Sequence, residues 1–277
     1  MSFSVNSNPG ALVALENLNQ TSQQLQTAQN VVSTGLAVSS AKDNGAIWAI
    51  AQNERATVSS LDAVKSSLQT GQSIIDVANS AGTTVSNLLT QMQQKALAAS
   101  DTSLDTNSRN ALNNDFVALR NQITSTVNNA DFNGVNLLDN SITSGQITSL
   151  ANAQGTSVLT TQAQNLSLGG SIITLAATAS ISTVTTAQQA ISICQTSLTN
   201  VDNALAYLGT ASTALDTHLN FVSNLQDTLT TGIGNLVNAD LAKESATLQA
   251  LQTKQQLGIQ ALSIANTASS AVLGLFR

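Results

Sequence analysis

The apolar residues of the N-terminal third recur at alternating steps of four and three positions. This spacing places them on one face of a helix, in a line called a seam below. Gly35, Ser39 and Ser40 interrupt the pattern, and we interpret residues 41–57 as a connector containing a short helix. The first seam comprises Ala11, Leu15, Leu18, Ser22, Leu25, Gln29, Val32 and Leu36.

Two further seams predict helices in the next part of the chain. The second comprises Val64, Leu68, Gly71, Ile75, Ala78, Gly82, Val85, Leu89, Met92, Ala96 and Ala99. The third comprises Leu112, Phe116, Leu119, Ile123 and Val127. Residues 133–186 then lose the helical period, and short apolar runs between Gly, Asn and Ser clusters predict a small β-rich insert.

The longest seam runs over residues 191–236, which as one helix would be about 70 Å long. Gly209, Gly232 and Gly234 are the positions where this helix could bend. Its members are Ile191, Cys194, Leu198, Val201, Leu205, Leu208, Ser212, Leu215, Leu219, Val222, Gln226, Leu229, Ile233 and Leu236.

The C-terminal segment, residues 237–277, carries apolar residues on two adjacent stripes, and a helix with two apolar faces needs partners on both. Residues 1–41 hold a single charged side chain, Glu16, and residues 255–276 hold none. We therefore expect both ends to be buried against each other and against neighbouring copies. The first stripe is Leu241, Leu248, Leu251, Leu262, Ala265, Val272 and Phe276, and the second is Leu257, Ala261, Ile264, Ala268, Ala271 and Leu275.

These patterns predict a mainly α fold, a long antiparallel, coiled-coil-like bundle of the N- and C-terminal segments with a small β-rich central insert. Charged residues make up 9% of the chain and aromatic residues 3%, which favours long helices packed by small side chains. The net charge of −6 and the absence of a basic run argue against nucleic-acid binding. No run of about 18 apolar residues indicates a membrane span.

The sequence offers no arrangement that predicts catalysis, a metal or a cofactor. Cys194 and His218 belong to the same predicted helix and would be about 36 Å apart, so they cannot form a thiol–imidazole pair within one copy. We expect Cys194 to be a small buried hydrophobe and His218 to be a polar residue of the helix surface. The first residues, MSFSVNSNPGALVALENLN, lack the basic and apolar regions of a classical signal peptide, so export would need another machine.

Three stretches resemble bacterial flagellins, with a short central insert like that of alphaproteobacterial members. They are NVVSTGLAVSSAKDNGAIWAIAQ, the turn DFNGVNLL at 131–138, and the C-terminal NADLAKESATLQALQTKQQLGIQALSIANTASSAVLGLFR. The resemblance implies a subunit secreted by the flagellar type III apparatus, which polymerises into the extracellular filament used for swimming. It implies core arms at 1–40 and 237–277, and outer-tube helices at 41–186, including the insert, and at 187–236.

The resemblance also implies partners. These are further copies of the chain or other flagellins, an export chaperone at the C-terminal arm, and hook-associated and cap proteins. In the family, an innate immune receptor recognises an R-x-R-E-L-type stretch, which reads Gln91, Met92, Gln93, Gln94 and Lys95 here. The arginine and glutamate are missing, so we predict weak or absent receptor recognition.

From the seams we predict that assembly contacts involve Leu15, Leu18, Leu25, Val32, Leu36, Leu241, Leu248, Leu251, Leu257, Leu262, Ile264, Val272, Leu275 and Phe276. Two alternatives stay open. A hook-filament junction protein would share the terminal arms, and a secreted adhesin with helical arms would use the Ser- and Thr-rich residues 140–186.

Overall fold

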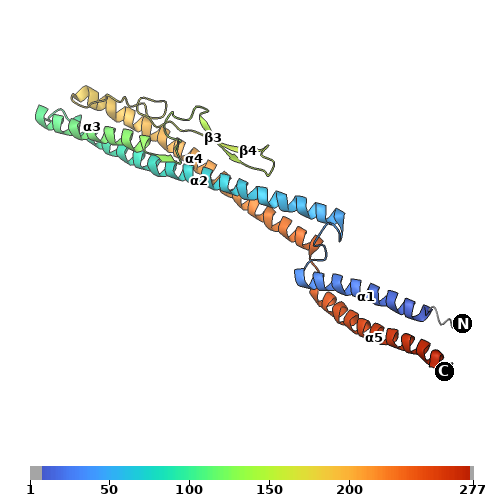
Figure 1. The fold of residues 1–277 in the computed structure, drawn as a ribbon. Coiled ribbons are helices and arrows are strands. Elements are labelled where there is room, and N and C mark those ends of the chain that lie inside the picture. The colour runs from blue at the N-terminus through green and yellow to red at the C-terminus, as the bar shows by residue number, and fades with distance from the viewer. Residues whose placement is uncertain (1–7, 275–277) are drawn as a thin grey trace. The chain divides into compact units, whose positions relative to one another are not determined.

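The computed structural model describes residues 8–274, with side chains described to residue 267, and Figure 1 labels its helices and the strands β3 and β4. The chain divides into two compact units. The arm unit comprises residues up to 56 and from 228, and the central unit comprises residues 57–227. The helices are α1 (Pro9–Thr34), α2 (Gly45–Ala99), α3 (Thr106–Asn128), α4 (Val184–Val237) and α5 (Leu241–Gly274).

The core of the central unit lies where α2, α3 and α4 meet. Every member of the predicted seam from Val64 to Ala99 is buried, which confirms the second seam. On α3, Phe116, Ile123 and Val127 are buried. On α4, the seam residues of the central unit are buried or half-buried. Small side chains on α2 allow α4 to approach closely, since a Cβ at Gly82 would lie 2.6 Å from Leu205 Cδ2.

The central insert contains two small antiparallel sheets. In the first, β1 (Asp131–Phe132) pairs with β2 (Val135–Asn136) across a turn in which Asn133 and Gly134 both have positive φ, as a tight hairpin of this hand requires. In the second, β3 (Gln146–Leu150) pairs with β4 (Val158–Gln162). The rest of the insert is mostly irregular chain, and four of its apolar side chains are buried, those of Leu166, Ile173, Leu175 and Ile181. The mainly α class with a small β-containing insert is confirmed.

The prediction of a connector with only a short helix at 41–57 is wrong, because the turn spans residues 41–43 and the long helix α2 begins at Gly45. The side chain of Asn44 caps the helix, its Oδ1 accepting from Ile47 N at 3.2 Å. No proline follows in 45–57 to stop the helix. Helix α4 continues unbroken past Gly209, Gly232 and Gly234, although each helical glycine costs about 1 kcal/mol relative to alanine.

The arm unit is built on an antiparallel pair of helices, α1 and α5, called the arm pair below (Figure 1). Asn8 caps the N-terminus of α1, its side chain accepting from Ala11 N at 3.1 Å, and Gly35 in the left-handed conformation caps the C-terminus. The two chain segments that leave the arm pair are tied by an antiparallel bridge between Leu36 and Asn238. Ala37 N donates to Val237 O at 2.7 Å, which fixes the register of the arm pair.

Candidate assembly interface

The contact between α1 and α5 is a continuous seam of small and aliphatic side chains. On α5 the half-buried positions are spaced alternately four and three residues apart, as in a coiled coil. Gly258 lets the helices approach, because a Cβ there would lie 3.3 Å from Leu18 Cδ1. The seam consists of Ala11, Ala14, Leu18, Thr21, Leu25, Ala28 and Val32 on α1, and of Leu248, Leu251, Gln255, Gly258, Leu262 and Ala265 on α5.

Polar side chains at this seam make hydrogen bonds both within one helix and across the pair. Thr21 is 2% exposed, and its hydroxyl donates to Asn17 O at 2.7 Å on its own helix. Asn8 Nδ2 donates to Ala265 O at 2.8 Å across the pair, and Gln255 Nε2 lies 3.4 Å from Ser22 Oγ. These contacts set Asn8 opposite Ala265 and Leu18 opposite Gly258, so the pairing is antiparallel throughout.

The predicted position of Leu15 in the α1–α5 seam is wrong, because Ala14 lies in the seam and Leu15 is 43% exposed. Leu241, assigned to the first stripe, is also exposed, at 48%. A straight helix has 3.6 residues per turn, whereas the predicted pattern repeats every 3.5 residues. The contact line therefore shifts slowly around the helix and can pass through either of two adjacent positions. Leu18, Leu25 and Val32 lie in the seam as predicted, with Leu248, Leu251 and Leu262 opposite.

Leu36 is half-buried at the bridge to Asn238. Of the remaining predicted assembly residues, Val272 lies in α5 but its side chain is outside the described residues, as are Leu275 and Phe276 altogether.

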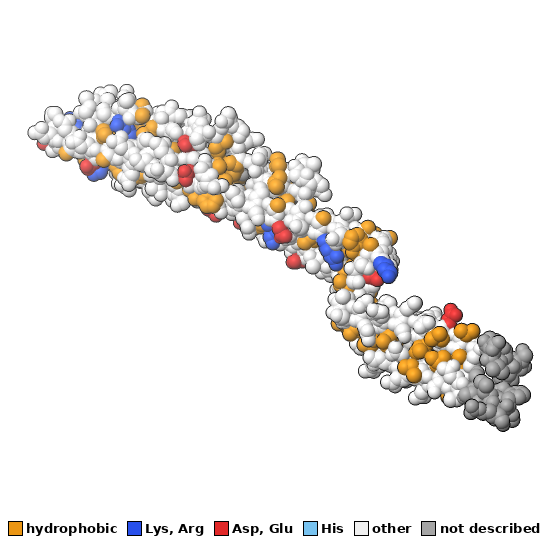
Figure 2. Space-filling view, viewed as in Figure 1, with side chains coloured by type: hydrophobic (Ala, Val, Ile, Leu, Met, Phe, Trp, Pro, Cys, Tyr) orange, Lys and Arg blue, Asp and Glu red, His pale blue; other side chains and the backbone are white. Residues whose placement is uncertain are grey.

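Both helices of the arm pair also carry large apolar residues that face away from the seam. Leu12 and Val13 on α1 are 63% and 61% exposed, and Leu257 and Ile264 on α5 are 59% and 69% exposed. Figure 2 shows hydrophobic side chains, in orange, over the visible face of the arm unit among mostly uncharged polar atoms. The described members of the second stripe of α5, Leu257, Ala261 and Ile264, are thus uncovered within one copy. Such a surface normally marks a site of association.

Comparisons with known proteins match both the N-terminal and the C-terminal part of the chain. Residues 5–143 match the family described as bacterial flagellin N-terminal helical region, and residues 191–276 match the bacterial flagellin C-terminal helical region. Flagellin FljO of Caulobacter vibrioides is 57% identical over 274 residues, which cover 99% of this chain and 98% of that protein. The chain belongs to the flagellin family.

More distant relatives span the chain equally fully. A flagellin of Brucella melitensis is 34% identical over 99% of each chain, and flagellin C of Rhizobium meliloti is 32% identical over 99% of each chain. This flagellin is therefore a structural subunit that self-assembles, and it is exported to form the extracellular flagellar filament. Swimming motility follows from the family.

Residues 91–95, which we predict to correspond to the receptor-binding motif, lie in α2 of the flagellin's central unit. Met92 is buried, and Gln91 and Gln94 are exposed. Gln93 is half-buried. The ammonium group of Lys95 lies 2.7 Å from Asp115 Oδ2 on α3. The one cation of this stretch therefore already has an intramolecular partner.

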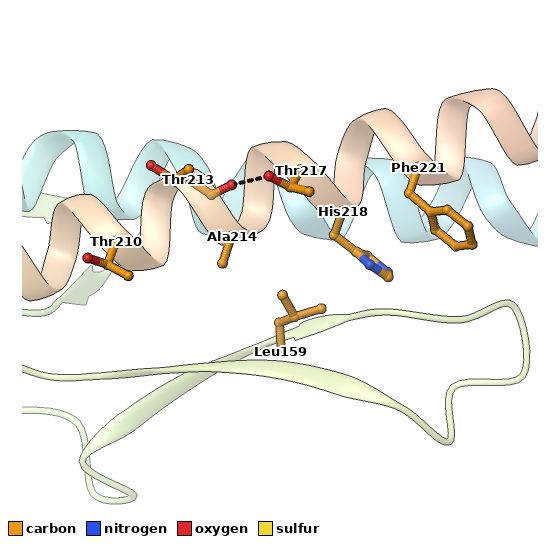
Figure 3. A pocket seen from close by; sticks show the side chains of 7 residues that line it. All are labelled: Leu159, Thr210, Thr213, Ala214, Thr217, His218 and Phe221. Atoms are coloured by element: carbon orange, nitrogen blue, oxygen red, sulfur yellow. Dashed lines mark hydrogen bonds between the residues drawn. The ribbon is translucent and has the colours of Figure 1, made fainter.

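A shallow apolar hollow lies between the β3–β4 hairpin and α4, lined by Leu159, Thr210, Thr213, Ala214, Thr217, His218 and Phe221 (Figure 3). His218 is half-buried here, so its prediction as a surface residue is wrong. Its Nε2 lies 2.7 Å from Ala151 O, to which it donates, and its ring centroid is 5.7 Å from that of Phe221. The histidine thus fastens the insert of the flagellin to α4.

Cys194 is fully buried in α4, as predicted, and burial raises the pKa of its thiol to about 11. Among residues 8–267 no group of His, Cys, Asp or Glu side chains is placed to hold a metal ion. Within the same described part of the flagellin, no helix combines the length and apolarity needed to cross a membrane.

Proposed function

We propose that this flagellin polymerises through the arm pair. The α1–α5 seam holds the two helices of each copy together, and the outward apolar residues join neighbouring copies. The observation that carries this proposal is the uncovered second stripe of α5. Leu257 and Ile264 make no seam contact within one copy, although each could contribute roughly 1 to 2 kcal/mol on burial. Leu12, Val13 and Leu15 form the corresponding surface on α1.

The distribution of charge supports the same assignment. Residues 1–41 contain one charged side chain and residues 245–276 contain one. Docking an uncharged surface avoids the cost of several kcal/mol for each unpaired buried ion. We therefore assign 1–40 and 237–277 to the filament core, and 41–186 and 187–236 to the outer tube.

Seeded polymerisation tests this function. A Leu257→Asn, Ile264→Asn double variant should fold as a subunit but fail to extend filament seeds, because two amides would have to be desolvated at the interface. Gln249→Asn, an exposed change on the same helix, is the matched control and should extend seeds normally. Filament growth by the double variant at the wild-type rate would contradict the role of the second stripe.

The same uncovered stripe supports binding of an export chaperone to the C-terminal arm before assembly. A bound chaperone should slow hydrogen exchange around Leu257 and Ile264, whereas unchanged exchange in the complex would place the chaperone elsewhere. We also propose that hook-associated and cap proteins contact the arm pair at the two ends of the filament, because they would meet the same apolar surfaces there.

We further propose that the innate immune receptor recognises this flagellin weakly or not at all. Gln91 and Gln94 offer amides in place of the charged groups of the motif, and Lys95 is held by Asp115. A receptor reporter assay at nanomolar protein should give little signal. Robust signalling would overturn this proposal.

We infer no catalytic role for the chain. The insert between Asp139 and Cys194 contains no acidic, basic or histidine side chain, so a nucleophile there would lack a general base. Assays of the purified filament for hydrolase activity on ester, peptide and glycoside substrates should show no turnover, and an activity lost on deletion of residues 140–186 would contradict this inference.

A further inference from the structure

Apart from Lys243 and Glu244 in the first turn of α5, the arm pair carries one isolated charge of each sign on its outer surface. Glu16 is the only charged side chain in residues 1–41, and Lys254 is the only one in residues 245–276. Both side chains are exposed. Among residues 8–267, the structure gives neither of them a hydrogen-bond or ion-pair partner.

Glu16 cannot meet Lys254 within one copy. It lies midway between the seam residues Ala14 and Leu18, so at about 100° per residue it points to the opposite side of α1. The pairing of Leu18 with Gly258 places Glu16 level with residue 260 on α5. Lys254 is therefore about 9 Å away along the helix axis as well as across the pair.

Each charge borders the outward apolar surface of its own helix. Glu16 lies three and four residues after Val13 and Leu12, and Lys254 lies three residues before Leu257, which are the separations of neighbours on a helix surface. One apolar surface therefore has a negative border and the other a positive border. Such surfaces are complementary in both polarity and charge.

We propose that, in the filament, Glu16 of one copy forms an ion pair with Lys254 of a neighbouring copy, and that this pair sets the register of the contact between outward surfaces. Copies related by a helical operation keep α1 and α5 antiparallel to each other. In an antiparallel contact, setting Glu16 opposite Lys254 also sets Val13 opposite Leu257, because both are three residues away. This inference rests on the proposed function, since it specifies which residues join the copies.

Charge reversal in separate chains tests the pair. Glu16→Lys and Lys254→Glu each place like charges across the contact, and each should raise the critical concentration for seeded growth at least about fivefold. An equimolar mixture of the two single variants should restore growth, because alternating copies bring opposite charges together again. The double variant Glu16→Lys, Lys254→Glu should also grow. Asp202→Lys, which changes the net charge of the chain as Glu16→Lys does at an exposed position of α4, is the control and should leave growth unchanged.

The outcomes separate the ion pair from the wider proposal. Growth of the double variant without growth of the mixture would place the pair within one copy and overturn the inference. Wild-type growth of both single variants would also overturn it. Suppose both single charge variants grow like the wild type. If the Leu257→Asn, Ile264→Asn variant still fails to grow, the proposal of apolar docking holds without the ion pair. If that variant grows as well, both proposals are wrong. The neutral variants Glu16→Gln and Lys254→Gln guard against misfolding, because each should grow with a weaker dependence on salt than the wild type.

Discussion

Truncation of Ile264 gives the most quantitative prediction, because this side chain is the most exposed of the large apolar residues in the described part of the arm pair. It is 69% exposed in one copy, so docking can still remove most of its surface from water. Ile264→Ala deletes three carbon atoms, each worth about 0.8 kcal/mol when fully buried. Scaled by the exposed fraction, the loss on docking is about 1.7 kcal/mol.

A loss of this size should raise the critical concentration about 15-fold, since 1.4 kcal/mol corresponds to a factor of ten. The assay is sedimentation of filaments at the plateau of seeded growth, with the soluble protein measured in the supernatant. Gln249→Ala, which removes an exposed amide on the same helix, should leave the critical concentration unchanged. Melting of the unpolymerised protein should be the same for both variants, because neither residue lies in the seam.

The reasoning would be refuted if Ile264→Ala polymerised at the wild-type critical concentration. It would also be refuted if the variant melted several degrees lower as a monomer, because the side chain would then contribute to the fold of one copy.

Three further predictions concern the fold. Asp43 Oδ2 accepts hydrogen bonds from the hydroxyl and the backbone N–H of both Ser39 and Ser40. These bonds, the one from the Ser39 hydroxyl foremost, hold the pKa of the Asp43 carboxyl below its usual 3.8. Because the pKa of Asp43 is lower in the folded state than in the unfolded state, its carboxylate stabilises the fold above pH 3.8, and this stabilisation disappears as the pH falls through the pKa of the folded state. Asp43→Ala should therefore melt lower than wild type at pH 7 but not at pH 2. Cys194 should resist thiol reagents at pH 8 in the native protein and react fully in denaturant, because it is buried and its pKa is about 11; rapid native labelling would contradict this. Arg109 donates to Ala99 O, Asp101 O and Leu104 O at the end of α2, so Arg109→Met should cost about 1 to 3 kcal/mol in denaturant unfolding, and an unchanged midpoint would show that solvent replaces these bonds.

Long helices were predictable because their apolar period persists over many turns. Every predicted member of the seam from Val64 to Ala99 is buried in the structure. Because α2 packs on both α3 and α4, little choice remains as to which face of the helix is buried. The α1 seam was less certain because it is rich in small residues. Ala14 and Leu15 are adjacent and both apolar, and only the partner helix decides which one faces the seam.

Contacts with the backbone could not be predicted from residue patterns. His218 binds the carbonyl of Ala151, and every residue has a carbonyl, so no residue type marks that partner. Thr21 is buried because it satisfies its hydroxyl on its own helix at Asn17 O. The two-stripe pattern of residues 237–277 did indicate which part of α5 one copy leaves uncovered, since Leu257 and Ile264 were assigned to the second stripe and are exposed.

Electron cryomicroscopy of the assembled filament tests the central proposal most directly, because it shows what covers the second stripe of α5. We predict that Leu257 and Ile264 of each copy are buried against the outward face of α1 of a neighbouring copy, near Val13. A density map in which both side chains face solvent, with the copies held together only through their central units, would contradict the account.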